Sequence, residues 1–184
     1  KGKVSKELWI NDKGLTHQDD GEPSSIRYYE SGSVAASGWF VNGIPNRKDG
    51  PSHITYYEDG TVNVESWYYY DKLNRLDGPA FVTYSEDGSI YQEVWCVNGK
   101  YHREDGPAIE RFNGNKEWFI TAKKLRIDGP ALERHIGPKD WWIIDLRHSE
   151  DGPAVEGGNV KKVGYLIGLL YREDVLAFIG PNGD

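Results

Sequence analysis

The sequence contains one cysteine, Cys96, and no methionine among its 184 residues. A single cysteine excludes a disulfide within the chain and a metal site built from several thiolates. Because methionine is absent, Lys1 is not expected to be the translational start, and we expect a chain that was processed or cut from something longer. A cytosolic setting and a disulfide-free extracellular setting both fit these counts.

Long apolar runs and clusters of basic residues are also missing. No segment approaches the eighteen or more apolar residues of a membrane-spanning helix, and the first six residues lack the apolar core of a signal peptide. The formal net charge is -7, and Lys and Arg are nowhere gathered as phosphate or anionic lipid would require. Neither nucleic acid nor a bare membrane is therefore expected as a partner.

Aromatic residues are abundant, with 7 Trp, 12 Tyr and 5 Phe, which is typical of many short strands. An acidic residue recurs every 28 or 29 residues in the first half of the chain and every 23 in the second, usually opening Asp-Gly-Pro-Ala. These residues are Asp20, Asp49, Asp77, Asp105, Asp128, Asp151 and Asp174. A Trp precedes most of them by ten residues, at Trp39, Trp67, Trp95, Trp118 and Trp141. The chain is thus predicted to be a repeat array.

Each repeat contains two turn signals. Asn98-Gly99, like Asn42-Gly43, predicts a two-residue type I′ hairpin turn, because both central positions need positive φ. A second turn is predicted at Ser31-Gly32, Asp59-Gly60, Asp87-Gly88 and Asn113-Gly114. The proline of Asp105-Gly106-Pro107 cannot donate to a strand ladder and is expected to begin the next strand at a kink. Each repeat is therefore predicted to be a β-hairpin linked to the next.

A lone hairpin is marginally stable in water, so the repeats are expected to stack. The predicted fold is all-β, an elongated single-sheet antiparallel meander of about seven stacked β-hairpin repeats. We expect one repeat domain over residues 1–184, with atypical capping units near 1–24 and 160–184 that protect the exposed edges. In the last unit, Val175 and Leu176 replace Gly-Pro and Tyr165 replaces Trp.

The Trp strand, the Asn-Gly turn and the Arg-x-Asp-Gly-Pro segment together resemble MORN-type repeats over residues 9 to 180. The resemblance is to the divergent class that also occurs in antitoxin-like bacterial proteins and in uncharacterised proteins of large bacteriophages, and it implies a MORN-like solenoid. Where MORN units usually carry His-Gly-x-Gly, this chain has Asp-Gly-Pro-Ala, and three units are lengthened. The phospholipid binding of some family members is accordingly not expected here.

The candidate chemical groups favour structural roles. Five arginines stand two residues before a motif Asp and are predicted to pair with it along one strand face, namely Arg47, Arg75, Arg103, Arg126 and Arg172. His17, His102 and His148 share one repeat position, but they belong to repeats too far apart to share an ion, so no metal site is expected. No nucleophile stands with a base at a suggestive spacing, and there is no phosphate loop. We expect neither enzymatic activity nor a cofactor.

The Trp strands are apolar on both faces, whereas a strand exposed on one side should alternate. The Trp column is taken as the buried seam. The opposite column is then either covered by the chain itself or exposed as an apolar stripe, and such stripes usually mark a partner surface. Four aromatic residues of this column are the predicted partner-binding anchors, Phe40, Tyr68, Phe119 and Trp142.

The sequence therefore predicts a non-enzymatic protein-binding or scaffold module of the bacterial or host cytoplasm, such as a bacteriophage factor in host-virus interaction. One alternative is a structural spacer in a larger assembly such as a virion, and homo-oligomerisation stays open. A weaker alternative is an acidic inhibitor of a nucleic-acid-processing enzyme, whose binding would weaken with salt.

Overall fold

The computed structural model describes residues 5–18, 20–148, 154–156, 163–166 and 169–173. The contacts of the chain divide it into two compact units, residues 1–100 and 101–184, which are described separately. Every named element is a β-strand, so the predicted all-β fold of antiparallel hairpin repeats is confirmed. No described helix is long and apolar enough to cross a membrane.

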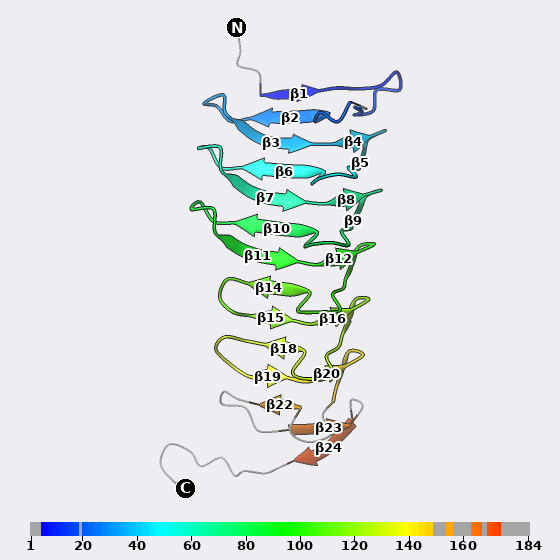
Figure 1. Ribbon diagram of the computed structural model, residues 1–184, viewed down its shortest axis with the longest axis vertical. Coiled ribbons are helices and arrows are strands. Elements are labelled where there is room, and N and C mark those ends of the chain that lie inside the picture. The colour runs from blue at the N-terminus through cyan, green and yellow to red at the C-terminus, as the bar shows by residue number, and fades with distance from the viewer. Residues whose placement is uncertain (1–4, 19, 149–153, 157–162, 167–168, 174–184) are drawn as a thin grey trace. The chain divides into compact units, whose positions relative to one another are not determined.

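The first unit is built on one antiparallel meander in the order β1-β2-β3-β6-β7-β10-β11, and Figure 1 shows these strands stacked one on the next. Their bounds are β1 Lys6–Leu8, β2 Ser25–Tyr28, β3 Val34–Gly38, β6 His53–Tyr56, β7 Val62–Ser66, β10 Phe81–Tyr84 and β11 Ile90–Val94. In each of the strand pairs β2-β3, β6-β7 and β10-β11, a β-bulge before the tyrosine of the first strand shifts the register.

Short hairpins form a second structural layer of the repeat that the single-sheet prediction did not include. In the first unit, β4 (Phe40–Val41) pairs with β5 (Ile44–Pro45), and β8 (Tyr68–Tyr69) pairs with β9 (Lys72–Leu73). Each pair is a separate two-stranded sheet at one end of the main strands (Figure 1). The next strands are β12 (Cys96–Val97) and β13 (Lys100–Tyr101), and the division between the units falls within β13.

The second unit repeats this plan, with shorter strands from β14 to β22. Its main order is β14-β15-β18-β19-β22-β23-β24. The bounds are β14 Ile109–Arg111, β15 Lys116–Glu117, β18 Leu132–Glu133, β19 Lys139–Asp140, β22 Val155–Glu156, β23 Val163–Leu166 and β24 Leu169–Glu173. Its short hairpins are β16 (Phe119–Ile120) with β17 (Lys123–Lys124) and β20 (Trp142–Ile143) with β21 (Leu146–Arg147).

Tryptophan stands where the chain leaves the main sheet and enters a short hairpin. The backbone N–H of Trp67 donates to the carbonyl of Ala80 in the next repeat at 2.7 Å, and the Trp67 carbonyl accepts the backbone N–H of Asn74 at 2.9 Å. Trp118 makes the same pair of bonds with Ala131 and Leu125. Each tryptophan backbone thus ties its own short hairpin to the following repeat.

The fully buried seam is made of small side chains and not of tryptophan. The Asp-Gly-Pro-Ala alanines Ala80, Ala108, Ala131 and Ala154 are 0% exposed, and so are the serines Ser24 and Ser52 in the same column. The five repeat tryptophans from Trp39 to Trp141 are half-buried. The prediction that the Trp column is the buried seam is therefore wrong, because a small residue lets neighbouring backbones approach more closely than an indole ring would.

The short hairpins turn as predicted where Asn-Gly is present. Asn42 and Gly43 have φ of 51° and 79°, and Asn98 and Gly99 have 51° and 76°. Neighbouring hairpins are joined through the turn, because the N–H of Gly43 donates to the carbonyl of Thr16 at 2.8 Å. In the first repeat the Asn11 side chain accepts N–H bonds from Lys13 and Leu15 within its own turn, and the capping unit near 1–24 stays a prediction. Asp174, Val175 and Leu176, in the other predicted cap, lie outside the described residues.

Candidate functional site

The place where the chain passes from the main sheet into a short hairpin is called the corner of the repeat. In three repeats an arginine lies on the tryptophan ring of this corner. The guanidinium carbons of Arg47, Arg75 and Arg126 lie 3.9, 4.3 and 4.1 Å from the ring centroids of Trp39, Trp67 and Trp118, respectively. Such stacking attracts the cation to the aromatic face and buries the aliphatic stem of the arginine. The tryptophan and the arginine of each pair stand eight residues apart in the sequence and contact each other across the short hairpin.

The same arginines hold the Asp-Gly-Pro turn. Arg75 Nε donates to Asp77 Oδ1 at 2.9 Å, and one terminal nitrogen donates to the Pro79 carbonyl at 3.3 Å. Arg103 and Arg126 make the equivalent bonds, at 2.9 and 3.4 Å and at 3.0 and 3.3 Å. The predicted Arg-Asp pairing is confirmed for these three repeats. Arg47 makes the proline contact, to Pro51 at 3.1 Å, and Asp174 of the last predicted pair is outside the described residues.

The pairing with arginine lowers the pKa of the aspartate carboxyl in three turns. The hydrogen bond from Arg75 and then its charge lower the pKa of the Asp77 carboxyl. Arg103 and Arg126 lower the pKa values of Asp105 and Asp128 for the same two reasons. The prolines do not begin the next strand as predicted, because β6, β10 and β14 each start two residues later.

A side chain on the glycine that follows Asp77 or Asp105 would displace the arginine of the same turn. A Cβ at Gly78 would lie 2.6 Å from Arg75 Cζ, and one at Gly106 would lie 2.9 Å from Arg103 Cζ. These glycines do not have positive φ. The Arg75 guanidinium therefore contacts the Trp67 ring and also lies close to Gly78.

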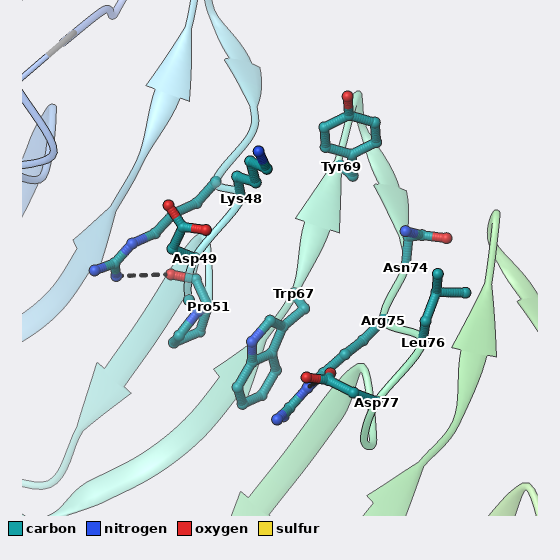
Figure 2. A pocket seen from close by; sticks show the side chains of 11 residues that line it. Lys48, Asp49, Pro51, Trp67, Tyr69, Asn74, Arg75, Leu76 and Asp77 are labelled. Carbon is teal, nitrogen blue, oxygen red and sulfur yellow. Dashed lines mark hydrogen bonds and ion pairs between the residues drawn. The ribbon is translucent and has the colours of Figure 1, made fainter.

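An open groove lies between two successive corners of the first unit, with a cavity volume of about 770 Å³. One wall is the segment Arg47–Pro51, and the other carries Trp67, Tyr69 and the segment Asn74–Asp77. Figure 2 shows Trp67 between Pro51 and the Arg75–Asp77 pair, with Tyr69 near the hairpin tip. Leu76 lines this groove and is 80% exposed.

A groove of about 630 Å³ occupies the equivalent position in the second unit. It is lined by the segment Arg103–Pro107 on one side and by Trp118, Ile120 and the segment Leu125–Asp128 on the other. Ile127, which corresponds to Leu76, is 90% exposed. The two grooves thus share a tryptophan, two arginines, a proline and an unusually exposed aliphatic side chain.

The four predicted anchors each lie at the first position of a short hairpin, and none of them lines the two grooves. Phe40, Tyr68, Phe119 and Trp142 are all half-buried, and Cys96, the remaining member of the column, is 2% exposed. In the second unit other side chains lie on the column: Lys124 Nζ is 5.3 Å from the Phe119 ring centroid and 5.5 Å from that of Trp142. Within each unit the anchors thus recur at the same position of successive short hairpins, and those of the second unit are partly covered.

The histidine column has a backbone-capping role. His17 Nδ1 accepts the Asn42 N–H at 3.1 Å, and His102 Nδ1 accepts the Thr121 N–H at 3.2 Å. Asn74 at the same repeat position accepts the Asn98 N–H through its side chain at 2.9 Å. These residues join neighbouring short hairpins, and no group of three His, Cys, Asp or Glu suited to a metal occurs among the described residues.

The groove residues were missed by sequence reasoning. Leu76 and Ile127 lie in the bend between the stacked arginine and its aspartate, after β9 and β17 have ended, and their side chains are exposed there. The signal was an aliphatic residue at a position where other repeats have Lys48 or Glu104. A scan against protein-family models finds no match to this chain, and neither does a search of curated protein sequences.

Proposed function

We propose that this chain is a non-enzymatic repeat module that binds a protein partner through the corner grooves and through the aromatic anchors of the short hairpins. The observation that carries the proposal is the recurrence of the same open groove in each unit, with Leu76 or Ile127 exposed in it. Exposed apolar groups that cluster with aromatic and arginine side chains are typical of protein-binding surfaces. A repeated surface suits an extended partner.

The titratable groups of the corner support binding over catalysis. Catalytic sites usually hold groups whose environments push their pKa values apart. Here the pKa values of Asp77, Asp105 and Asp128 are lowered in the same direction by the same kind of arginine. Burial raises the pKa of the Cys96 thiol to about 11, which disfavours the nucleophilic thiolate.

The proposal includes Phe40, Tyr68, Phe119 and Trp142 as a second contact face. Half-buried aromatic side chains can gain further burial against a partner, and aromatic anchors dominate many interfaces. The MORN-type resemblance, carried by the Arg-x-Asp-Gly-Pro segment, supports a cytoplasmic bacterial or bacteriophage setting within this proposal. A spacer role in a virion remains the alternative that uses the same array without a foreign partner.

The test is an affinity capture from host lysate, read by mass spectrometry. Two variants of verified fold are compared with the wild type: Leu76→Ser/Ile127→Ser in the grooves and Tyr68→Ser/Phe119→Ser in the column. Loss of one captured protein in either variant supports a binding module and identifies its face. Capture of the chain itself alone, or retention of every protein by both variants, contradicts the proposal and favours the spacer.

A further inference from the structure

The first corner of the array differs from the two corners that form grooves. Its turn reads Asp20-Gly21-Glu22-Pro23-Ser24 and has one residue more than Asp49-Gly50-Pro51-Ser52. In this longer turn the Gly21 carbonyl accepts a hydrogen bond from Trp39 Nε1 at 2.9 Å. The chain therefore fills the first corner with a backbone carbonyl of its own.

The tryptophans of the open grooves lack this partner. Within the described part of the chain, the indole N–H groups of Trp67 and Trp118 meet no hydrogen-bond acceptor, and neither nitrogen is among the buried unsatisfied atoms. Both donors are therefore open to solvent inside a groove. A donor in this position can bind an incoming carbonyl without leaving another group unpaired.

We propose that each groove binds an extended, proline-containing segment of the protein partner, in an inference that rests on the proposed function. A backbone carbonyl of the segment accepts the indole N–H of Trp67 or Trp118, as the Gly21 carbonyl accepts that of Trp39. A polyproline II segment suits this site because its carbonyls have no internal hydrogen bonds and its conformation is already ordered before binding. The proline rings of the segment pack on Leu76 in the first unit and on Ile127 in the second.

The two grooves differ in charge and should prefer different segments. Lys48 in the first groove is replaced by Glu104 at the equivalent position of the second. The first groove has one more positive than negative side chain, and the second has one more negative than positive. The first groove is thus expected to prefer an acidic residue beside the prolines and the second a basic one.

The experiment follows the tryptophan indole ¹H–¹⁵N signals of the full chain during peptide titration. The probes are acetyl-Pro-Pro-Glu-Pro-Pro-Glu-Pro-Pro-amide, its lysine counterpart, and a control with Gly and Ser in place of Pro. The Trp67 signal is expected to shift with the acidic probe and the Trp118 signal with the lysine probe, whereas Trp39 keeps its position. Absence of shifts at Trp67 and Trp118, or equal shifts with the Gly-Ser peptide, would overturn the inference.

Matched variants assign the signals and test the donor. Trp67→Phe keeps a ring beneath Arg75 but removes the N–H, and we expect roughly five- to tenfold weaker binding of the acidic probe. Trp39→Phe, which removes a donor already satisfied within the chain, should leave that affinity unchanged. Lys48→Glu should reverse the charge preference of the first groove, and an unchanged preference would contradict the inference that this side chain selects the acidic probe.

The peptide titration and the lysate capture can fail independently of each other. If lysate capture depends on Tyr68 and Phe119 but the peptides bind to neither groove, the binding module stands and the proline inference fails. If the peptides bind but no partner is captured, the grooves recognise extended chains and the proposed function fails in the host tested.

Discussion

The two units have the same corners but differ in their arms, which are the hairpins of the main sheet that extend from the corners. In the first unit strands β2 to β11 of the main sheet have four or five residues, and Tyr57 Oη donates to the Tyr84 carbonyl of the next repeat at 2.7 Å. In the second unit strands β14, β15, β18, β19 and β22 have only two or three residues, and these arms carry ion pairs such as Arg111 with Glu117 at 2.9 Å. The corner of stacked Trp and Arg is present in each unit.

This difference shows which part of the repeat determines the fold. The arm can change its length and exchange a tyrosine hydroxyl for an ion pair, because each solution satisfies only local groups. The corner joins consecutive repeats through buried backbone and therefore tolerates little change in side-chain volume. The following predictions test this separation between corner and arm.

The largest effect is expected from enlarging the buried alanine. Ala80→Leu in the first unit and Ala131→Leu in the second should each lower the free energy of unfolding by about 3 kcal/mol, because neither site has room for added methylenes. Urea denaturation measures both. A much smaller loss in one unit would show that its corner is not closely packed, and Leu76→Ala, at an exposed position, serves as the control.

The arginine stack should give the next largest effect. Arg75→Ala and Arg126→Ala are expected to cost about 1–2 kcal/mol each, since both lose a stacked ring and a bond to a proline carbonyl. Arg126→Ala should cost more because Arg126 also bonds Glu133 at 2.7 Å. Equal costs in urea denaturation would show that the Glu133 pair contributes nothing.

The turns of the short hairpins offer a reciprocal exchange between the units. Ile144 has φ of 50°, a strained value for a β-branched residue, whereas Asn98 has 51° at the equivalent position of the first unit. Ile144→Asn should raise the free energy of unfolding by about 1 kcal/mol, and Asn98→Ile should lower it by about the same amount. Thermal unfolding of both variants checks the sign, and destabilisation by Ile144→Asn would contradict the strain argument.

The sequence predicted the repeat, the Asn-Gly turns and the Arg-Asp pairs because these follow from local spacing. It did not predict the turns at Tyr70-Asp71, Thr121-Ala122 and Ile144-Asp145, which lack the Asn-Gly pair. There the hairpin is held by stacking, since the Ala122 N–H donates to the Tyr101 carbonyl at 2.8 Å. The grooves were also beyond sequence reasoning, because they depend on which faces of successive corners meet.

The smallest effect concerns a histidine in an arm of the first unit. Burial and then the charge of Arg27 lower the pKa of His53, so the folded state favours the neutral imidazole. Its contribution to stability is therefore fully present above the unfolded pKa of about 6.5 and is lost as pH falls below that value. Later repeats have Phe81, Ile109 and Leu132 at the same position.

Replacing His53 with an apolar residue should make the stability contribution of this position independent of pH, as it is in the later repeats. His53→Leu is expected to gain stability relative to the wild type as pH falls from about 7.5 to about 5.5, because the variant has no imidazole to protonate on unfolding. Urea denaturation at several pH values measures the difference between the two proteins. Phe81→Leu is the matched control, since its effect should not change with pH. A constant difference between His53→Leu and the wild type would show that His53 titrates alike in both states and that its surroundings are more hydrated than the packing indicates.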